Sequence, residues 1–399
     1  MAMTPEESQR MDPIINRINL NRVAEDLWQL VKIPSPTGNE RRAALAFAEM
    51  LERSGASVEV DETFPSSPAV IGRLSGNRPG RIFQLAGHID HIDVPHAPPS
   101  RDDKFIRGRG SADMKNGLAA ILETVRVLSE TGRDFAGQIL VTVYGLHEAP
   151  AGDSGSITRL IQKGIVGNAA LVAESTHSAE GAIVVAGKGQ SVWNVTITRS
   201  GQACHELNYP ADAPDFFHAC LSVARALDEQ GAKLAGAKST WELLSPESLF
   251  TGQMHFGDFY NRVPASCTLQ GTRRWHPDKR LADVRKEMDG VLASVSLPAG
   301  VSVTCDWIFV GESYAVDRED PVVRSQCRAI QSITGIVPEF KGVSVVTDAN
   351  RLVPLGGVPT VLCGFDNEFA HADAEYVRMD RLLEPCRIMM LTALEYLNG

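Results

Sequence analysis

The 399-residue chain contains no apolar run approaching the roughly 18 residues that a membrane-spanning helix needs. It also lacks an excess of positive charge, since 39 Lys and Arg residues stand against 49 Asp and Glu residues, for a formal net charge of −10. Nucleic-acid binding requires a broad basic surface, which this balance does not provide. We therefore expect a small-molecule substrate, and neither a membrane nor a nucleic acid as partner.

Cysteine is scarce, and its pattern is not that of a disulfide framework. The seven cysteines are odd in number, widely spaced and without a C-x-x-C pair. The N-terminal residues show no basic start followed by an apolar stretch, the pattern of a secretory signal. These absences predict a cytoplasmic protein.

Hydrophobic residues make up 43% of the chain, enough for a well-buried core, and the length suggests two or three domains. Helix and strand patterns alternate in the first half, after about 20 residues that we interpret as a loose arm. This alternation is typical of an α/β fold with a mostly parallel sheet flanked by helices. The predicted helices there are 23–31, 40–54 and 115–130, and the predicted strands are 57–60, 81–86, 138–144 and 169–173.

The pattern changes near residue 188 to strands of period-two alternation, which indicates an antiparallel sheet. We predict that an α+β domain of residues 188–309, with two helices, is inserted into a catalytic domain of residues 1–187 and 310–399. The predicted strands of the insert are 191–198, 251–256, 267–274 and 301–307, and its helices are 215–230 and 280–294. The catalytic domain then continues with helix 321–334, strand 360–363 and helix 378–397.

Residue types that bind metals follow several predicted strands directly. Because the carboxyl ends of strands in an open α/β sheet border one crevice, we expect these side chains to converge. Asp90 lies two residues after His88 and is predicted to hold its second ring nitrogen, as is usual for a metal-bound imidazole. The candidate residues are His88, Asp90, Asp113, Glu148, Glu174 and, far down the chain, His371.

In their order, these segments resemble the zinc-dependent hydrolases that include aminoacylase, glutamate carboxypeptidase, acetylornithine deacetylase and succinyl-diaminopimelate desuccinylase. Residues 87–95 are close to that family's G-H-x-D-x-V-P segment, residues 108–117 match G-R-G-x-x-D-M-K-x-G, and residues 371–376 match H-x-x-x-E-Y. The predicted insert adds similar motifs at residues 201–205, 261–264 and 274–277. The resemblance covers nearly the whole chain.

The resemblance implies a role for each candidate. His88 and Glu174 would bind one metal, Asp113 would bridge to a second metal, and His371 would bind that second metal. Glu148 would be the general base that activates water, a task that a nearby cation makes possible for a carboxylate.

The predicted insert would supply the remaining site residues. His205 would polarise the scissile group, in the family across a dimer interface, while Asn261 and Arg274 would hold an anionic part of the substrate. The resemblance therefore implies a homodimer or a higher homo-oligomer.

Two departures from the family pattern bear on the site. Ala149 stands where the family has a carboxylate ligand of the second metal, so either that site is weakened, or Glu148 shifts into the ligand role, or another residue substitutes. The possible substitutes are His91, His147 and Asp153. We expect one or two metal ions per chain, with one slightly favoured, and zinc or manganese as the metal.

The second departure is Phe365 with Asp366, in place of a small loop that borders the substrate in the family.

We predict a metal-dependent hydrolase that cleaves a C–N bond of a small substrate, as an amidase, deacylase or carboxypeptidase does. One alternative is hydrolytic deamination of an aromatic amine at a mononuclear site. Another alternative, a non-catalytic binding protein on the same fold, would require loss of the base or of the ligands.

Overall fold

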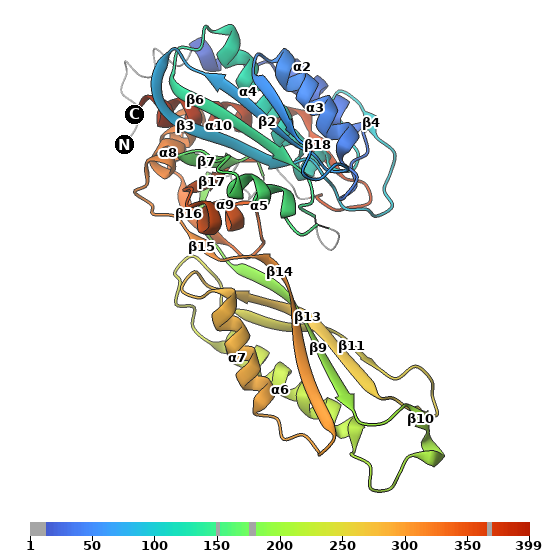
Figure 1. Cartoon of the computed structure of the whole chain (residues 1–399). Helices are drawn as coiled ribbons and strands as arrows, with labels where there is room; N and C mark the ends of the chain where they lie inside the picture. Colours follow the sequence, from blue (N-terminus) through green and yellow to red (C-terminus); the bar gives the residue numbers. More distant parts are fainter. Residues whose placement is uncertain (1–12, 149–151, 175–180, 365–368) are drawn as a thin grey trace. The chain divides into compact units, whose positions relative to one another are not determined.

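The computed structural model describes residues 13–148, 152–174, 181–364 and 369–399. The chain divides into two compact units (Figure 1). The first unit takes in the chain up to Val185 together with 315–342 and 347–399, and the second takes in 186–314 together with 343–346. The second unit thus extends beyond the predicted insert of residues 188–309 at both ends.

The first unit is built on a six-stranded mixed sheet. Strands β6, β3, β7 and β17 pair in parallel, whereas β1 and β2 join the edge in antiparallel fashion. The predicted α/β class with a mostly parallel sheet is confirmed. In spatial order the strands are β1 (Ser57–Asp61), β2 (Ala69–Ser75), β6 (Ala136–Tyr144), β3 (Arg78–His88), β7 (Ala169–Val172) and β17 (Thr360–Leu362).

Helices cover this sheet, and their ends follow local sequence signals. The Asn19 side chain accepts hydrogen bonds from two main-chain N–H groups at the start of the first described helix, and Asp320 caps the helix that begins at Pro321. The C-terminal helix packs on β3 and β6 and is buried along most of its length. The helices are α2 (Leu20–Val31), α3 (Arg41–Arg53), α4 (Asn116–Glu130), α5 (Gly155–Gln162), α8 (Pro321–Thr334), α9 (Ala349–Gly356) and α10 (Leu383–Asn398).

The structure corrects two predictions at the ends of the chain. Ile15 and Ile18 are buried, so the described part of the first 20 residues is not a loose arm. The last helix begins at Leu383 and not at residue 378, because β18 (Tyr376–Arg378) pairs with β5 (Phe105–Arg107), which itself pairs with β4 (Ser100–Arg101).

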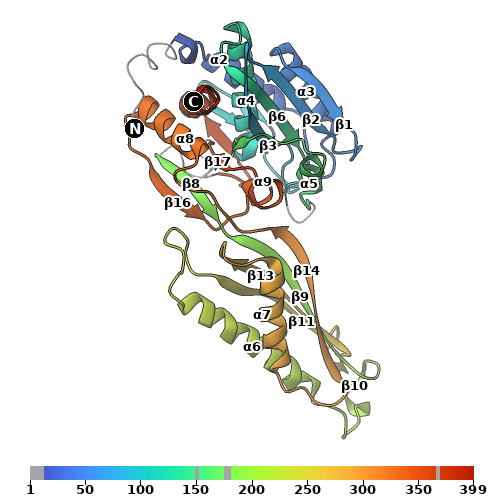
Figure 2. The ribbon, with the colours of Figure 1, turned by 60° about the vertical axis from the view of Figure 1, so that its left-hand side comes forward.

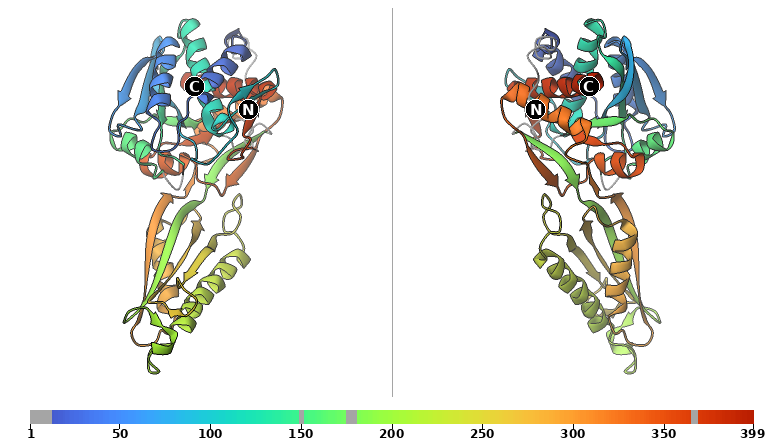
Figure 3. Two further views of the ribbon diagram at one scale, coloured as in Figure 1. Left: turned by 90° about the vertical axis from the view of Figure 1, so that its right-hand side faces the viewer. Right: turned by 90° about the vertical axis from the view of Figure 1, so that its left-hand side faces the viewer.

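The second unit contains a four-stranded antiparallel sheet in the order β11–β13–β9–β14. Helices α6 (Phe216–Gly236) and α7 (Leu281–Ala293) lie along one face of it (Figures 2 and 3), and a core around Trp193 and Leu269 fills the space between the two layers. The strands are β9 (Gly189–Arg199), β11 (Ser248–Phe256), β13 (Ser266–Trp275) and β14 (Val301–Gly311), with a short pair of β10 (Cys204–His205) and β12 (Arg262–Val263).

A small three-stranded sheet contains three of the four places where the chain passes between the two units, and the fourth lies between residues 346 and 347. Its strands are β15 (Tyr314–Ala315), β8 (Ala182–Gly187) and β16 (Glu339–Val343).

Among the described residues, no helix combines the length and the apolar character that crossing a membrane would require.

Candidate metal centre

The predicted metal-binding side chains of the first unit stand at a strand end or in the segments that connect its strands and helices. His88 is the last residue of β3, Glu148 follows β6, and Glu174 follows β7. Asp113 lies in the irregular turn that leads into α4, and His371 lies in the segment between β17 and β18. Since β3, β6 and β7 are parallel neighbours, their carboxyl ends lie side by side, as the crevice rule for open sheets requires.

Asp113 lies between the two candidate histidines. Its Oδ1 is 3.3 Å from Nε2 of His88, and its Oδ2 is 3.3 Å from Nε2 of His371. Nε2 of His371 is also 3.0 Å from Oε1 of Glu148, and potential ligand atoms of His88, Asp113 and Glu148 lie within 4.8 Å of one another. One carboxylate with one oxygen directed at each histidine is the arrangement that a bridging ligand needs.

Unsatisfied polar atoms at this centre show that its residues fit a metal ion. Nε2 of His88 and Oε2 of Glu174 are buried and have no hydrogen-bond partner among the described residues. Each buried polar atom without a partner lowers the stability of the fold by about 1–3 kcal/mol. Burial also raises the pKa of the Glu174 carboxyl group to about 8. A divalent cation would satisfy both atoms and would favour the ionised carboxylate. Mixed imidazole and carboxylate donors suit zinc or manganese.

The loop that carries Asp113 is held by Glu375, a buried carboxylate from the far end of the chain. Its Oε1 accepts hydrogen bonds from the main-chain N–H groups of Ala112 and Asp113, at 2.8 and 3.1 Å. Its Oε2 accepts from the N–H of Gly110 at 3.0 Å and from Nη1 of Arg109 at 3.2 Å. The family-like H-x-x-x-E-Y motif thus pairs one candidate ligand with a residue that positions another.

Asp90 fixes the neighbouring loop. Its Oδ2 accepts hydrogen bonds from Oγ1 of Thr37 and from the main-chain N–H groups of His147 and Glu148, all at 2.9 Å. Nδ1 of His88 is 3.2 Å from the Asp90 carbonyl oxygen and 3.5 Å from its Oδ1. The predicted contact with the ring is thus made mainly through the main chain, while the carboxylate holds the segment that presents Glu148.

Sequence reasoning missed a second imidazole–carboxylate pair at the centre. The ring of His147 stacks on the ring of His88, with centroids 4.1 Å apart and planes 3° apart. Nδ1 of His147 is 2.9 Å from Oδ1 of Asp348, whose Oδ2 accepts a hydrogen bond from the Tyr144 hydroxyl at 2.7 Å. Burial lowers the pKa of His147, but Asp348 and Glu174 outweigh it and raise the pKa to about 9. No motif marks Asp348, so its part in the centre was not visible in the sequence.

The other proposed substitutes for the missing carboxylate have partners of their own. Nε2 of His91 accepts a hydrogen bond from the N–H of Ser35 at 3.0 Å, and its Nδ1 donates to the carbonyl of Ile92 at 2.9 Å. Oδ1 of Asp153 accepts from the N–H of Gly155. Both ring nitrogens of His91 are therefore occupied, and Asp153 is not among the described residues whose potential ligand atoms meet at the centre. Ala149, Phe365 and Asp366 lie outside the described residues.

The second unit brings His205 and Asn261 together but not Arg274. Nε2 of His205 is 3.1 Å from Nδ2 of Asn261, and its Nδ1 accepts a hydrogen bond from the N–H of Leu207 at 3.2 Å. Arg274 stands near the other end of β13, where it donates to the carbonyl oxygen of Ser344. From Ser266 to Arg274, eight residue steps along the strand alone span about 27 Å. Asn261 and Arg274 are thus not brought together within this unit.

Comparisons with known proteins give a family match and two named relatives over most of the chain. The model of peptidase family M20/M25/M40 matches residues 84–395. The chain is 24% identical to a succinyl-diaminopimelate desuccinylase of Methylobacterium radiotolerans over 372 residues, which cover 89% of this chain and 91% of the relative. It is 27% identical to a putative [LysW]-lysine/[LysW]-ornithine hydrolase of Pyrococcus abyssi, over 91% of this chain and 90% of the relative.

Among solved structures, the aminopeptidase PepT of Bacillus cereus is similar in fold. The two structures superpose with a TM-score of 0.76 at 21% identity, over 96% of this chain and all of the other.

The contact between Gly117 and Ala173 provides a test of how the centre is built. A Cβ at Gly117 would lie 1.9 Å from the carbonyl oxygen of Ala173, the residue before Glu174. We predict that Gly117→Ala forces the start of α4 away from the segment after β7. The substitution should lower the free energy of unfolding by about 1–3 kcal/mol and weaken metal retention. Thermal unfolding and metal content after dialysis measure both effects.

A matched control for this substitution is Gly290→Ala, an exposed helical position where an added Cβ meets nothing within 4 Å. It should keep the metal and leave stability unchanged or raise it by up to about 1 kcal/mol. Unaltered unfolding and full metal content in Gly117→Ala would contradict the role assigned to this contact.

Proposed function

Since the chain belongs to peptidase family M20/M25/M40 and is a metal-dependent hydrolase that acts on amide C–N bonds, we propose that it cleaves small N-acylated amino acids. The observation that carries this proposal is the convergence of His88, Asp113, Glu148 and His371 around buried atoms that lack partners. The names of the two relatives, a desuccinylase and a hydrolase of a lysine or ornithine conjugate, support the substrate class. The comparisons do not favour deamination or a non-catalytic role.

Each residue has a task in this reaction. When bound, a divalent ion polarises the scissile carbonyl and lowers the pKa of a nearby water. Glu148, whose main chain is held by Asp90, accepts the proton of the attacking water and delivers it to the departing nitrogen. The His371 imidazole, 3.0 Å from the Glu148 carboxylate, keeps that group in place.

We propose one firmly bound ion per chain, zinc or manganese, held by His88, Asp113 and Glu174. A second position, between Asp113 and His371, has Glu148 as its nearest carboxylate among the described residues. If Glu148 serves as the base, that position keeps only Asp113 and His371 as ligands among the described residues and should hold its ion weakly.

We also propose a homodimer in which His205 and Asn261 act on substrate at the partner's metal centre. A small substrate cannot reach both the His205–Asn261 pair and Arg274 of one copy, because about 27 Å of strand lies between them. Two copies of the chain remove this conflict.

All seven cysteines are free, which supports a reducing compartment such as the cytoplasm.

The direct test of the function is a panel of N-acyl amino acids and dipeptides with wild-type protein and Glu148→Gln. The substitution keeps the size of the side chain but removes the proton acceptor, so turnover should fall by about 10²–10⁴ while metal content stays similar. Loss of metal from Glu148→Gln would make Glu148 a ligand, and undiminished turnover would exclude it as the base.

Mixed dimers test the role of His205. Neither His205→Ala nor Glu148→Gln should be active alone, but mixing them should restore up to about a quarter of the wild-type activity. Half of the randomly exchanged dimers contain both kinds of subunit, and each of these has one site with an intact base and an intact partner histidine.

The control mixes Glu148→Gln with wild-type-like His255→Ala, whose exposed imidazole lies on β11 and has only a long contact with Gln253. If subunit exchange is verified by mass spectrometry and the first mixture stays inactive, His205 does not act across subunits.

A further inference from the structure

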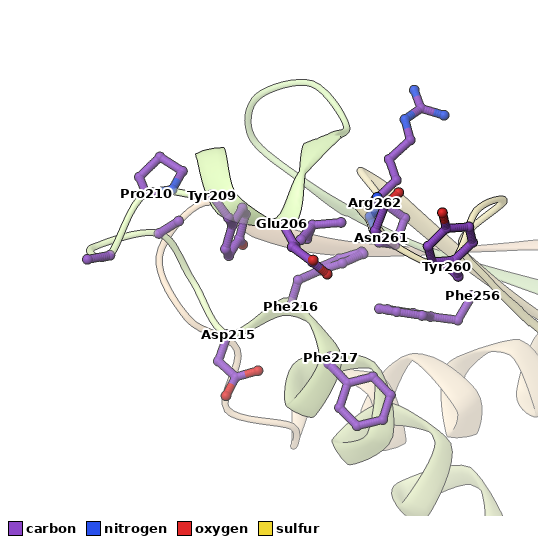
Figure 4. A pocket seen from close by; sticks show the side chains of 14 residues that line it. Glu206, Tyr209, Pro210, Asp215, Phe216, Phe217, Phe256, Tyr260, Asn261 and Arg262 are labelled. Carbon is purple, nitrogen blue, oxygen red and sulfur yellow. The ribbon is translucent and has the colours of Figure 1, made fainter.

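The second unit contains a cavity of about 590 Å³ that is lined in part by Asn261, the partner of His205 (Figure 4). This volume falls within the usual range of small-molecule sites. The walls come from the segment after β10, the start of α6, the end of β11 and the turn before β12. Fourteen residues line the cavity, and five of them are aromatic although aromatic residues make up only 6% of the chain: Tyr209, Phe216, Phe217, Phe256 and Tyr260.

The wall of this cavity is fixed in advance. The Arg199 guanidinium lies over the Tyr209 ring, 4.8 Å from its centroid, and donates hydrogen bonds to the carbonyl oxygens of Pro264 and Gln202, both at 2.8 Å. The Tyr209 hydroxyl donates to the carbonyl of Pro214. One buried arginine thus holds two lining residues, Tyr209 and Pro264, so that little conformational entropy is lost in this part of the wall when a ligand enters.

The aromatic residues share the lining with Asn261 of the pair. Phe256 packs against Phe216, with centroids 5.9 Å apart, and Tyr260 is 88% exposed beside them. Asn261, whose Nδ2 is 3.1 Å from Nε2 of His205, is itself part of the lining. A substrate whose carbonyl contacts the pair therefore places the group attached to that carbonyl in or against this cavity.

The charges of the lining disfavour an anionic occupant. Arg262 is paired with Asp258, and Asp215 caps α6 and contacts His218. The Glu206 carboxylate has no hydrogen-bond partner among the described residues, and Figure 4 shows it on the same side as Phe216, while the Arg262 guanidinium extends away from the rings. An acyl chain ending in a carboxylate would meet an uncompensated negative charge here.

We propose that this cavity is the acyl-group site of the enzyme and that it selects an aromatic or bulky apolar acyl group over a dicarboxylic one. The inference rests on the proposed amide hydrolysis and names the substrate class within it. Offset or edge-on contacts with the aromatic wall would supply the binding energy, and Glu206 would reject a succinyl-type chain.

The experiment compares phenylacetyl, acetyl and succinyl derivatives of one amino acid. Wild-type kcat/KM should be highest for the phenylacetyl compound. Tyr260→Ala removes an exposed part of the wall, and Ala211→Trp fills the cavity from an exposed position. In both variants the ratio of kcat/KM for phenylacetyl over acetyl should fall by about 10-fold, the usual worth of one apolar contact in a specificity pocket.

Phe250→Ala is the matched control, because Phe250 is an equally large exposed aromatic of the same unit (63% exposed) that does not line the cavity. It should leave the ratio unchanged. An unchanged ratio in both cavity variants would overturn the proposal, as would a shift of their oligomeric state in light scattering, which would make the cavity a contact between copies.

Calorimetric binding of the phenylacetyl compound to Glu148→Gln protein separates this inference from the proposed function. If Tyr260→Ala weakens binding about 10-fold but the wild type hydrolyses no amide, only the proposed reaction is refuted. Hydrolysis without any acyl preference would refute only the site.

Discussion

The Asp113 carboxylate, placed between two imidazoles and held by its own main chain, is the constraint on which the centre depends. One oxygen is directed at His88 and the other at His371, and these histidines come from residues 283 positions apart in the sequence. Glu375 accepts two N–H groups of the Asp113 loop, so the segment that brings His371 also fixes the carboxylate that His371 faces. Buried and partly unsatisfied, this cluster is costly without a cation and favourable with one.

Much of this could be predicted from the sequence, because strand ends in an open sheet converge wherever the strands are parallel. His88, Glu148 and Glu174 were found in this way, whereas Asp113, at a glycine-rich helix entrance, and His371 owed their assigned roles to the family resemblance. Asp348 was not, because a lone aspartate in a loop has no signal until the fold brings it to His147.

The short elements were missed for a similar reason. Strand β18 pairs with β5 across 270 residues, and nothing in its three residues distinguishes it from the start of the helix that was expected there. In the second unit the alternating strands were visible, but the opposite placement of Asn261 and Arg274 depends on strand direction and register. That separation, and the aromatic cavity lined in part by Asn261, are the observations behind the proposed role of the second unit in choosing the substrate.

The central claim is that these side chains form a metal centre with one tight site. Titration calorimetry of chelator-treated protein with zinc or manganese tests it most directly, with elemental analysis after dialysis. We expect one firmly bound ion per chain in the wild type and in His255→Ala, and none in His88→Ala. Retention of the ion by His88→Ala, or no tight binding by the wild type, would contradict it.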